Sequence, residues 1–158
     1  MQDGRLIRHH ATMAGRIYSV GYEGMSVGAL VDRLSGADVT TLVDVRMTPS
    51  SRRPGWSRKA LTASLEAAGL EYVHEKALGN PPDNRDSFRT GDGEIGRRRM
   101  REILSNGSSE AIDRLIGLAD GNRIAVLCVE RERQRCHRQV ITDMVRERDP
   151  SIEVVHIL

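Results

Sequence analysis

Aromatic residues are scarce in this sequence: its 158 residues include one Phe, one Trp and three Tyr. The hydrophobic core must therefore be built mainly from aliphatic side chains. Long apolar runs are also missing, and no segment approaches the roughly 18 apolar residues that a membrane-spanning helix needs. Residues 1–15 contain Arg, His and Asp without an apolar centre, which is not the pattern of a secretory signal peptide. We therefore expect a protein that does not enter a membrane.

Cysteine is scarce too, with only Cys128 and Cys136. Two cysteines without a secretory pattern favour a reducing compartment, so we expect a cytoplasmic location. The net charge of +2 is too small to predict nucleic-acid binding from bulk electrostatics. Arginine greatly outnumbers lysine, and the guanidinium group suits bidentate contact with phosphate or carboxylate. Anion binding would therefore depend on where the arginines cluster.

From residue 15 onward, short apolar segments alternate with amphipathic segments of helical period. The predicted strands are 16–20, 40–45, 70–74, 124–129 and 152–157. This alternation predicts an α/β fold: a single three-layer, doubly wound domain over 15–158 with a mainly parallel five-stranded sheet. The first two strands are expected to form a parallel pair. Residues 1–14 are expected to be a disordered N-terminal lead-in, and 75–93 a long irregular loop with a lid or binding role.

The longest apolar run, Ile124 to Val129, predicts a strand buried on both faces. Cys128 lies at its carboxyl end, where open α/β sheets form binding crevices. Cys136 lies at or just before the N-terminus of the next helix and is flanked by Arg135, His137 and Arg138. These surroundings favour a thiolate, and they would equally favour a bound anion. The alternative is that each cysteine is simply a small buried hydrophobic residue.

The loops after four of the strands should converge on one site. The candidate catalytic residues are Cys136 as nucleophile or redox thiol, His137 as proton shuttle, Glu130 as acid or base, Cys128 and Asp44. The candidate substrate- or anion-binding residues are Tyr22, Glu23, Arg46, Ser51, Arg52, Arg85 and Arg138. A purely structural Asp44–Arg46 pair that fixes its loop is the alternative for those two residues.

Several short motifs occur in these loops: Ser19-Val-Gly-Tyr-Glu-Gly24, Val43-Asp-Val-Arg46, Leu78-Gly79, and Leu127-Cys-Val-Glu130 followed by Cys136-His-Arg138. Their combination, from about Arg16 to the C-terminus, resembles domain-of-unknown-function family 488. The resemblance implies a small α/β domain and a location for the site, but no particular reaction. The sequence departs from the family at Asn80, where members often carry a second glycine.

The favoured hypothesis is a small cytoplasmic enzyme that acts on an anionic, phosphate- or nucleotide-bearing substrate with a Cys-His-Arg site. The alternative is a nucleic-acid or nucleotide binding module that uses the arginine clusters, with Tyr22 and Trp56 stacking on bases. No metal is predicted, because the Cys-x7-Cys-His spacing of Cys128, Cys136 and His137 matches no standard zinc pattern. A reversible Cys128–Cys136 disulfide, the cofactor and the oligomeric state are left open.

Overall fold

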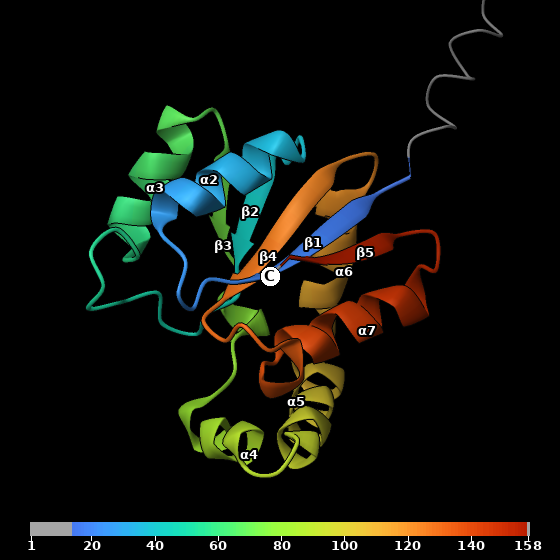
Figure 1. The fold of residues 1–158 in the computed structure, drawn as a ribbon. Helices are drawn as coiled ribbons and strands as arrows, with labels where there is room; N and C mark the ends of the chain where they lie inside the picture. Colours follow the sequence, from blue (N-terminus) through green and yellow to red (C-terminus); the bar gives the residue numbers. More distant parts are fainter. Residues whose placement is uncertain (1–13, 158) are drawn as a thin grey trace, which may run out of the picture.

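The computed structural model describes residues 14–157, and the predicted lead-in over 1–14 lies almost entirely outside this range. The chain forms a five-stranded sheet whose strands all run parallel, in the order β3-β2-β4-β1-β5 (Figure 1). The strands are β1 (Arg16–Gly21), β2 (Thr41–Asp44), β3 (Glu71–His74), β4 (Arg123–Cys128) and β5 (Glu153–Ile157). The predicted α/β class and parallel sheet are confirmed.

Helices cover both faces of the sheet and make the three predicted layers (Figure 1). The main helices are α2 (Val27–Gly36), α3 (Arg58–Ala67), α5 (Glu94–Asn106), α6 (Ser109–Ala119) and α7 (Arg138–Arg148). One apolar cluster joins α2 and α3 to one side of the sheet, and a second joins α5, α6 and α7 to the other. Both clusters are mainly aliphatic, as the scarcity of aromatic residues requires.

Serine side chains cap the N-termini of two helices. The hydroxyl of Ser26 accepts a hydrogen bond from Ala29 N at the start of α2, and that of Ser57 accepts one from Ala60 N at the start of α3. Such caps satisfy backbone N–H groups that have no partner within the helix. The turn from α3 into β3 passes through Gly69, whose positive φ of 81° an L side chain rarely adopts.

The pairing of the first two strands differs from the prediction. β1 and β2 run parallel, but β4 lies between them and pairs with both. β4 is the apolar run that the sequence singled out, and its residues Ile124–Cys128 are all buried. A strand without polar positions is most stable at the centre of a sheet covered on both faces, which is why it enters between two strands that precede it in the chain.

The segment 75–93 is not the irregular loop that its glycines and prolines suggested. It contains two short 3₁₀ turns, η1 (Lys76–Leu78) and η2 (Pro82–Asn84), and the short helix α4 (Arg85–Arg89). Leu78, Asn84 and Phe88 are buried, so the segment packs against the domain. Asn84 donates to the Asn80 side chain and to the Gly96 carbonyl, which ties the segment to α5.

Two glycines allow neighbouring loops to touch at the carboxyl edge of the sheet. A Cβ at Gly21 would lie 1.9 Å from the Glu130 carbonyl oxygen, and one at Gly79 would lie 2.6 Å from Met47 Cα. Only glycine permits such close backbone contact. Within the described residues, no helix has both the length and the apolar character needed to cross a membrane.

Candidate active site

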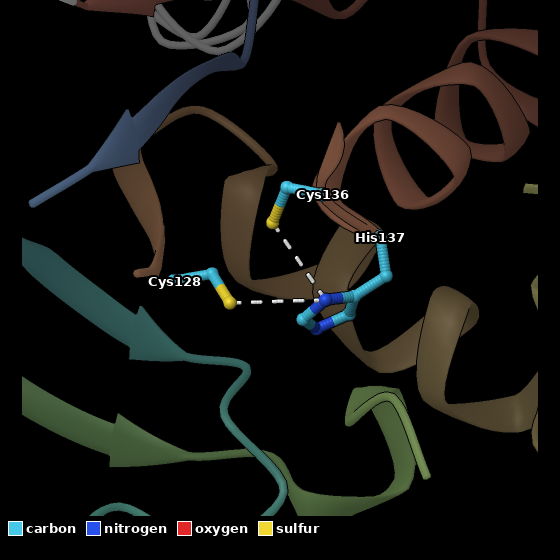
Figure 2. Close-up of side chains that lie close together, drawn as sticks. All are labelled: Cys128, Cys136 and His137. Carbon is cyan, nitrogen blue, oxygen red and sulfur yellow. Dashed lines mark hydrogen bonds between the residues drawn. The ribbon is translucent and has the colours of Figure 1, made fainter. Parts of the chain in front are cut away.

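Two sulfurs and an imidazole meet at the carboxyl end of β4 (Figure 2). Nδ1 of His137 lies 3.7 Å from Sγ of Cys128 and also 3.7 Å from Sγ of Cys136. The two sulfurs and the nitrogen all lie within 4.8 Å of one another. All three residues are buried, with 5%, 1% and 4% of their surfaces exposed. We call Cys128, Cys136 and His137 the Cys-His cluster.

A backbone carbonyl fixes the orientation of the His137 ring. Nε2 of His137 lies 2.8 Å from the carbonyl oxygen of Val45, just beyond β2. Because a carbonyl oxygen only accepts hydrogen bonds, Nε2 must carry a proton. Nδ1 is then the nitrogen that exchanges a proton or offers a lone pair, and it faces both sulfurs.

Arg138 lies at the start of α7 and is almost completely buried. Its Nε donates to Sγ of Cys136 over 3.4 Å, one terminal nitrogen donates to the hydroxyl of Ser19 over 2.6 Å, and the other donates to the Glu130 carbonyl. The guanidinium therefore joins β1 and the loop after β4 to the cluster. Its charge is positioned to stabilise a thiolate at Cys136.

The surroundings of the two cysteines shift their pKa values in opposite directions. Burial by itself would raise the pKa of Cys136, but the nearby Cys128 thiol and the charges of His137 and Arg138 lower this pKa well below its usual value. The pKa of Cys128 is raised by its contact with Cys136 and by burial. Burial would lower the pKa of His137, but the Cys136 charge raises it overall, and burial raises the pKa of Glu130. These opposite directions favour the thiolate form at Cys136 over Cys128.

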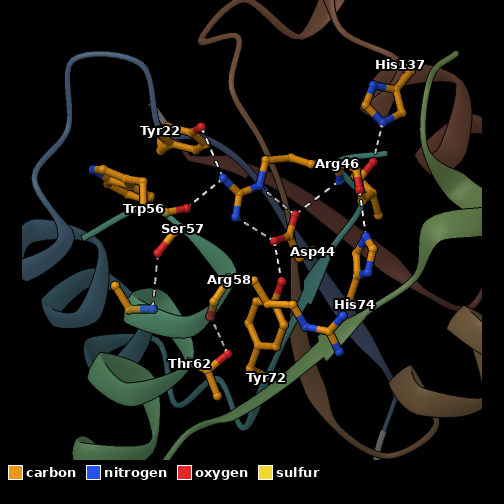
Figure 3. Close-up of polar contacts among 12 residues, drawn as sticks. Tyr22, Asp44, Arg46, Trp56, Ser57, Arg58, Thr62, Tyr72, His74 and His137 are labelled. Atoms are coloured by element: carbon orange, nitrogen blue, oxygen red, sulfur yellow. Dashed lines mark hydrogen bonds and ion pairs between the residues drawn. The ribbon is translucent and has the colours of Figure 1, made fainter. Parts of the chain in front are cut away.

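A second polar network lies beside the cluster at the end of β2 (Figure 3). The carboxylate of Asp44, which has no exposed surface, accepts from Nε of Arg46 over 2.9 Å and from Nη2 of Arg46 over 2.7 Å. It also accepts from the backbone N–H of Arg46 and from the hydroxyl of Tyr72. This ion pair fixes the backbone of the loop whose Val45 carbonyl orients His137.

The Arg46 guanidinium has further partners inside the protein. Nη1 of Arg46 donates to the Trp56 carbonyl over 2.8 Å and to the hydroxyl of Tyr22 (Figure 3). The backbone carbonyl oxygen of Arg46 lies 2.8 Å from Nε2 of His74. Burial would lower the pKa of Arg46, but the hydrogen bonds and charge of Asp44 raise it overall. These contacts match the structural alternative for this pair. The anion-binding role of Arg46 stays a prediction.

Tyr22 and Trp56 pack against each other. Their rings stack with centroids 4.0 Å apart, and both residues are buried. The guanidinium of Arg53 covers the pair. Neither ring face is open to a base in this arrangement, so the pair gives no support to the nucleic-acid alternative.

Two adjoining cavities lead to the Cys-His cluster. One has a volume of about 440 Å³ and is lined in part by Cys136, and the other has a volume of about 240 Å³ and is lined in part by Cys128. The residues that line both are Asn80, Arg85, Arg89, Val129, Glu130 and His137. We call this joint space the arginine cleft.

Arg85 and Arg89, both on α4, supply the positive charge of the cleft, together with Arg135. All three side chains are exposed. Arg89 pairs with Asp86 and Arg135 with Glu132, whereas Arg85 forms no ion pair with any residue that the structure describes. Among the arginines that line the cleft, Arg85 is therefore the one whose charge is most available to a bound anion.

The structure brings most of the predicted site residues to one edge of the sheet, but not all to the cleft. Cys128, Cys136, His137, Glu130, Arg46, Arg85 and Glu23 line its cavities. Arg138, Asp44 and Tyr22 lie behind these walls, with their polar groups bonded to protein atoms. Ser51 and Arg52 line neither cavity, and the Ser51 hydroxyl accepts from the Arg53 backbone instead.

Sequence reasoning missed the positioning residues Ser19, Tyr72 and His74 and the cleft residues Arg89 and Asn80. Ser19 begins one of the quoted motifs and His74 ends a predicted strand, so both positions were usable signals. Arg89 lies in the same 75–93 segment as Arg85, which was predicted to bind an anion, so its position was a usable signal too.

One family model covers most of the chain. The family model described as "Domain of unknown function DUF488" matches residues 26–145, which is more than half of the chain. The chain therefore belongs to the DUF488 family. No curated protein and no solved structure matches it.

Proposed function

We propose that this protein is a small enzyme that acts on an anionic, phosphate- or nucleotide-bearing substrate through a Cys-His-Arg site. The observation that supports this most strongly is the arrangement of the arginine cleft. Its exposed cations surround the approach to a sulfur that itself contacts Nδ1 of His137 and Nε of Arg138. Glu23, Glu130 and Glu132 line the same cleft, so the local arginines of α4, and not a net positive charge, would hold an anionic substrate near this sulfur.

Each residue of the site has a role in this proposal. Arg85 and Arg89 bind the anionic group, and Cys136 attacks the electrophilic atom of the substrate. The new bond joins sulfur to substrate, and the bond to the leaving group breaks. The leaving group takes a proton from Nδ1 of His137, and Glu130 activates the water that later hydrolyses the covalent intermediate. Arg138 holds the thiolate in position.

The nucleic-acid alternative receives less support. Arg97, Arg99 and Arg101 on α5, which could have formed a basic helix face, bond to Gln134, Asp83 and Glu147. Arginines that are already paired release fewer counterions from a phosphate backbone and contribute less affinity.

Two alkylating reagents test the proposal without a known substrate. Reduced, metal-free protein is treated with anionic iodoacetate or with neutral iodoacetamide, and modification of each cysteine is followed by mass spectrometry. We expect the ratio of the two rates at Cys136 to favour iodoacetate by about tenfold or more relative to a free thiol such as glutathione. Arg85→Ala should lower the ratio, and added phosphate should slow both reactions.

The matched control is Arg98→Ala, since Arg98 is an exposed arginine on α5 that lines neither cavity. This variant should keep the wild-type ratio. The proposal is wrong if Cys136 stays unmodified in the folded protein, or if the rate ratio equals that of glutathione and is the same in the Arg85 and Arg98 variants.

A further inference from the structure

We infer that the Cys-His cluster is a binding site for a zinc ion, held by Sγ of Cys128, Sγ of Cys136 and Nδ1 of His137 (Figure 2). This inference stands on the geometry of the cluster and does not require the proposed activity. The linear spacing of these residues gave no zinc pattern. The fold instead creates the site, by placing the end of β4 beside the start of α7.

The two nitrogen–sulfur distances fit the ion. Zinc bonds of about 2.3 Å to sulfur and 2.0–2.1 Å to nitrogen, at a tetrahedral angle, place sulfur and nitrogen about 3.6 Å apart. Nδ1 of His137 lies 3.7 Å from each of the two sulfurs. In a tetrahedral zinc site, the nitrogen ligand lies at this same distance from each of the two sulfur ligands.

The histidine is also prepared as a ligand. Its Nε2–H is held by the Val45 carbonyl, which leaves the lone pair of the neutral ring on Nδ1, facing the sulfurs. Zinc-binding histidines generally donate their other ring N–H in this way, because the hydrogen bond fixes both tautomer and ring orientation. The Asp44–Arg46 pair holds the loop that supplies this carbonyl.

The nearest donor for the fourth coordination position is the Glu130 carboxylate, whose Oε2 lies 3.5 Å from Sγ of Cys128. Binding releases the proton of Cys128, together with any proton on Nδ1 of His137, and the ion neutralises two thiolates. A buried pair of thiolates is otherwise costly, because charges removed from water need compensation. Zinc, a borderline-soft ion, prefers this sulfur and nitrogen donor set over the harder Mg²⁺ or Ca²⁺.

Zinc at this position would also regulate the proposed chemistry. The ion would occupy the sulfur of Cys136 and the nitrogen of His137 that the nucleophilic step uses. The zinc-loaded protein would then be resistant to alkylation at Cys136, and removal of the ion would restore the reactivity.

The test measures metal content and coordination on the full, reduced chain. After incubation with Zn²⁺ and dialysis, we expect one zinc per chain by elemental analysis, and X-ray absorption should show two sulfur ligands at about 2.3 Å. Cys128→Ser, Cys136→Ser and His137→Ala should each weaken the affinity by about tenfold or more. His156→Ala, a histidine outside the cluster, should keep it.

Sulfur coordination in the wild-type protein does not depend on whether a variant folds. Zinc bound without sulfur, or no zinc retained by reduced protein, would overturn the inference. The two proposals fail separately: alkylation of metal-free protein reports on the nucleophile, whereas metal content reports on the zinc site.

Discussion

Replacement of Asp44 by Asn should reveal how much the fold depends on the buried ion pair at the end of β2. Asp44 is fully buried, and its carboxylate accepts four hydrogen bonds, three from Arg46 and one from Tyr72. Asn preserves the size of the side chain but removes the charge, and its amide group would face the donors of Arg46. The guanidinium is then left buried without a counter-charge, since Arg46 is only 5% exposed.

Removal of one partner from a buried ion pair costs about 3–5 kcal/mol, because the remaining charge stays desolvated. For a chain of this length, that loss lowers the melting temperature by roughly 10 °C. The change is measured by urea unfolding of wild-type and Asp44→Asn proteins, with m-values compared to confirm that the unfolding transition is the same.

Asp113→Asn is the matched control. Asp113 also pairs with an arginine, Arg148, over 2.8 Å, but 68% of its side chain is exposed. An exposed pair contributes about 0–1 kcal/mol, because water and salt screen it. If Asp44→Asn costs no more than Asp113→Asn at an unchanged m-value, the reasoning about this network is refuted.

Further changes test other parts of the account. Gly79→Ala should lower the free energy of unfolding by about 1–3 kcal/mol, because the added Cβ would overlap Met47 Cα. Gly28→Ala should raise it by about 0.5–1 kcal/mol, because Gly28 lies in α2 and an added Cβ would meet nothing within 4 Å. Urea unfolding measures both changes, and equal effects would contradict the packing. Tyr72→Phe should cost about 1–2 kcal/mol through the lost bond to Asp44, and an unchanged unfolding free energy would show that this bond adds nothing. Burial and nearby arginines lower the pKa of His156 from 6.5 to about 4. As the pH falls, the unfolded chain therefore binds a proton before the folded protein does, and the free energy of unfolding should fall between pH 6.5 and 4. In thermal melts, His156→Asn should lose part of this pH dependence, and a pH profile identical to that of the wild type would contradict the argument.

The sequence carried enough information to predict the sheet and most of its helices. The apolar run of β4 and the alternation of short apolar segments with amphipathic segments are local signals, and both gave the correct kind of element. The order of strands was not local. Insertion of β4 between β1 and β2 depends on which strand best fits a position covered on both faces, and only the assembled sheet decides that.

The site was predictable in location but not in the partners of its charged groups. Arg46, Arg85 and Arg138 look equivalent in a sequence, since each follows a strand or precedes a helix in a polar loop. The structure separates them: Arg46 bonds to Asp44, Arg138 bonds to Ser19 and the cluster, and Arg85 lines the cleft. These partners lie up to 119 residues away in the chain, so no local pattern identifies them.

The Cys-His cluster was also hidden by linear spacing. Cys136 and His137 are adjacent, and neighbouring residues on a regular helix point about 100° apart. Here both precede the first turn of α7, so the helical rule does not apply to them and both side chains reach the end of β4.

The central claim is that the ends of separate strands converge to place a reactive sulfur beneath a cleft whose arginines bind an anion. Its most direct test is protection of Cys136 by phosphate: metal-free protein is alkylated with iodoacetate, with and without phosphate, and each cysteine is quantified by mass spectrometry. The account predicts that Cys136 reacts before Cys128, that phosphate slows this reaction, and that Arg85→Ala weakens the protection. Reaction of Cys128 first, or protection that is the same without Arg85, would contradict it.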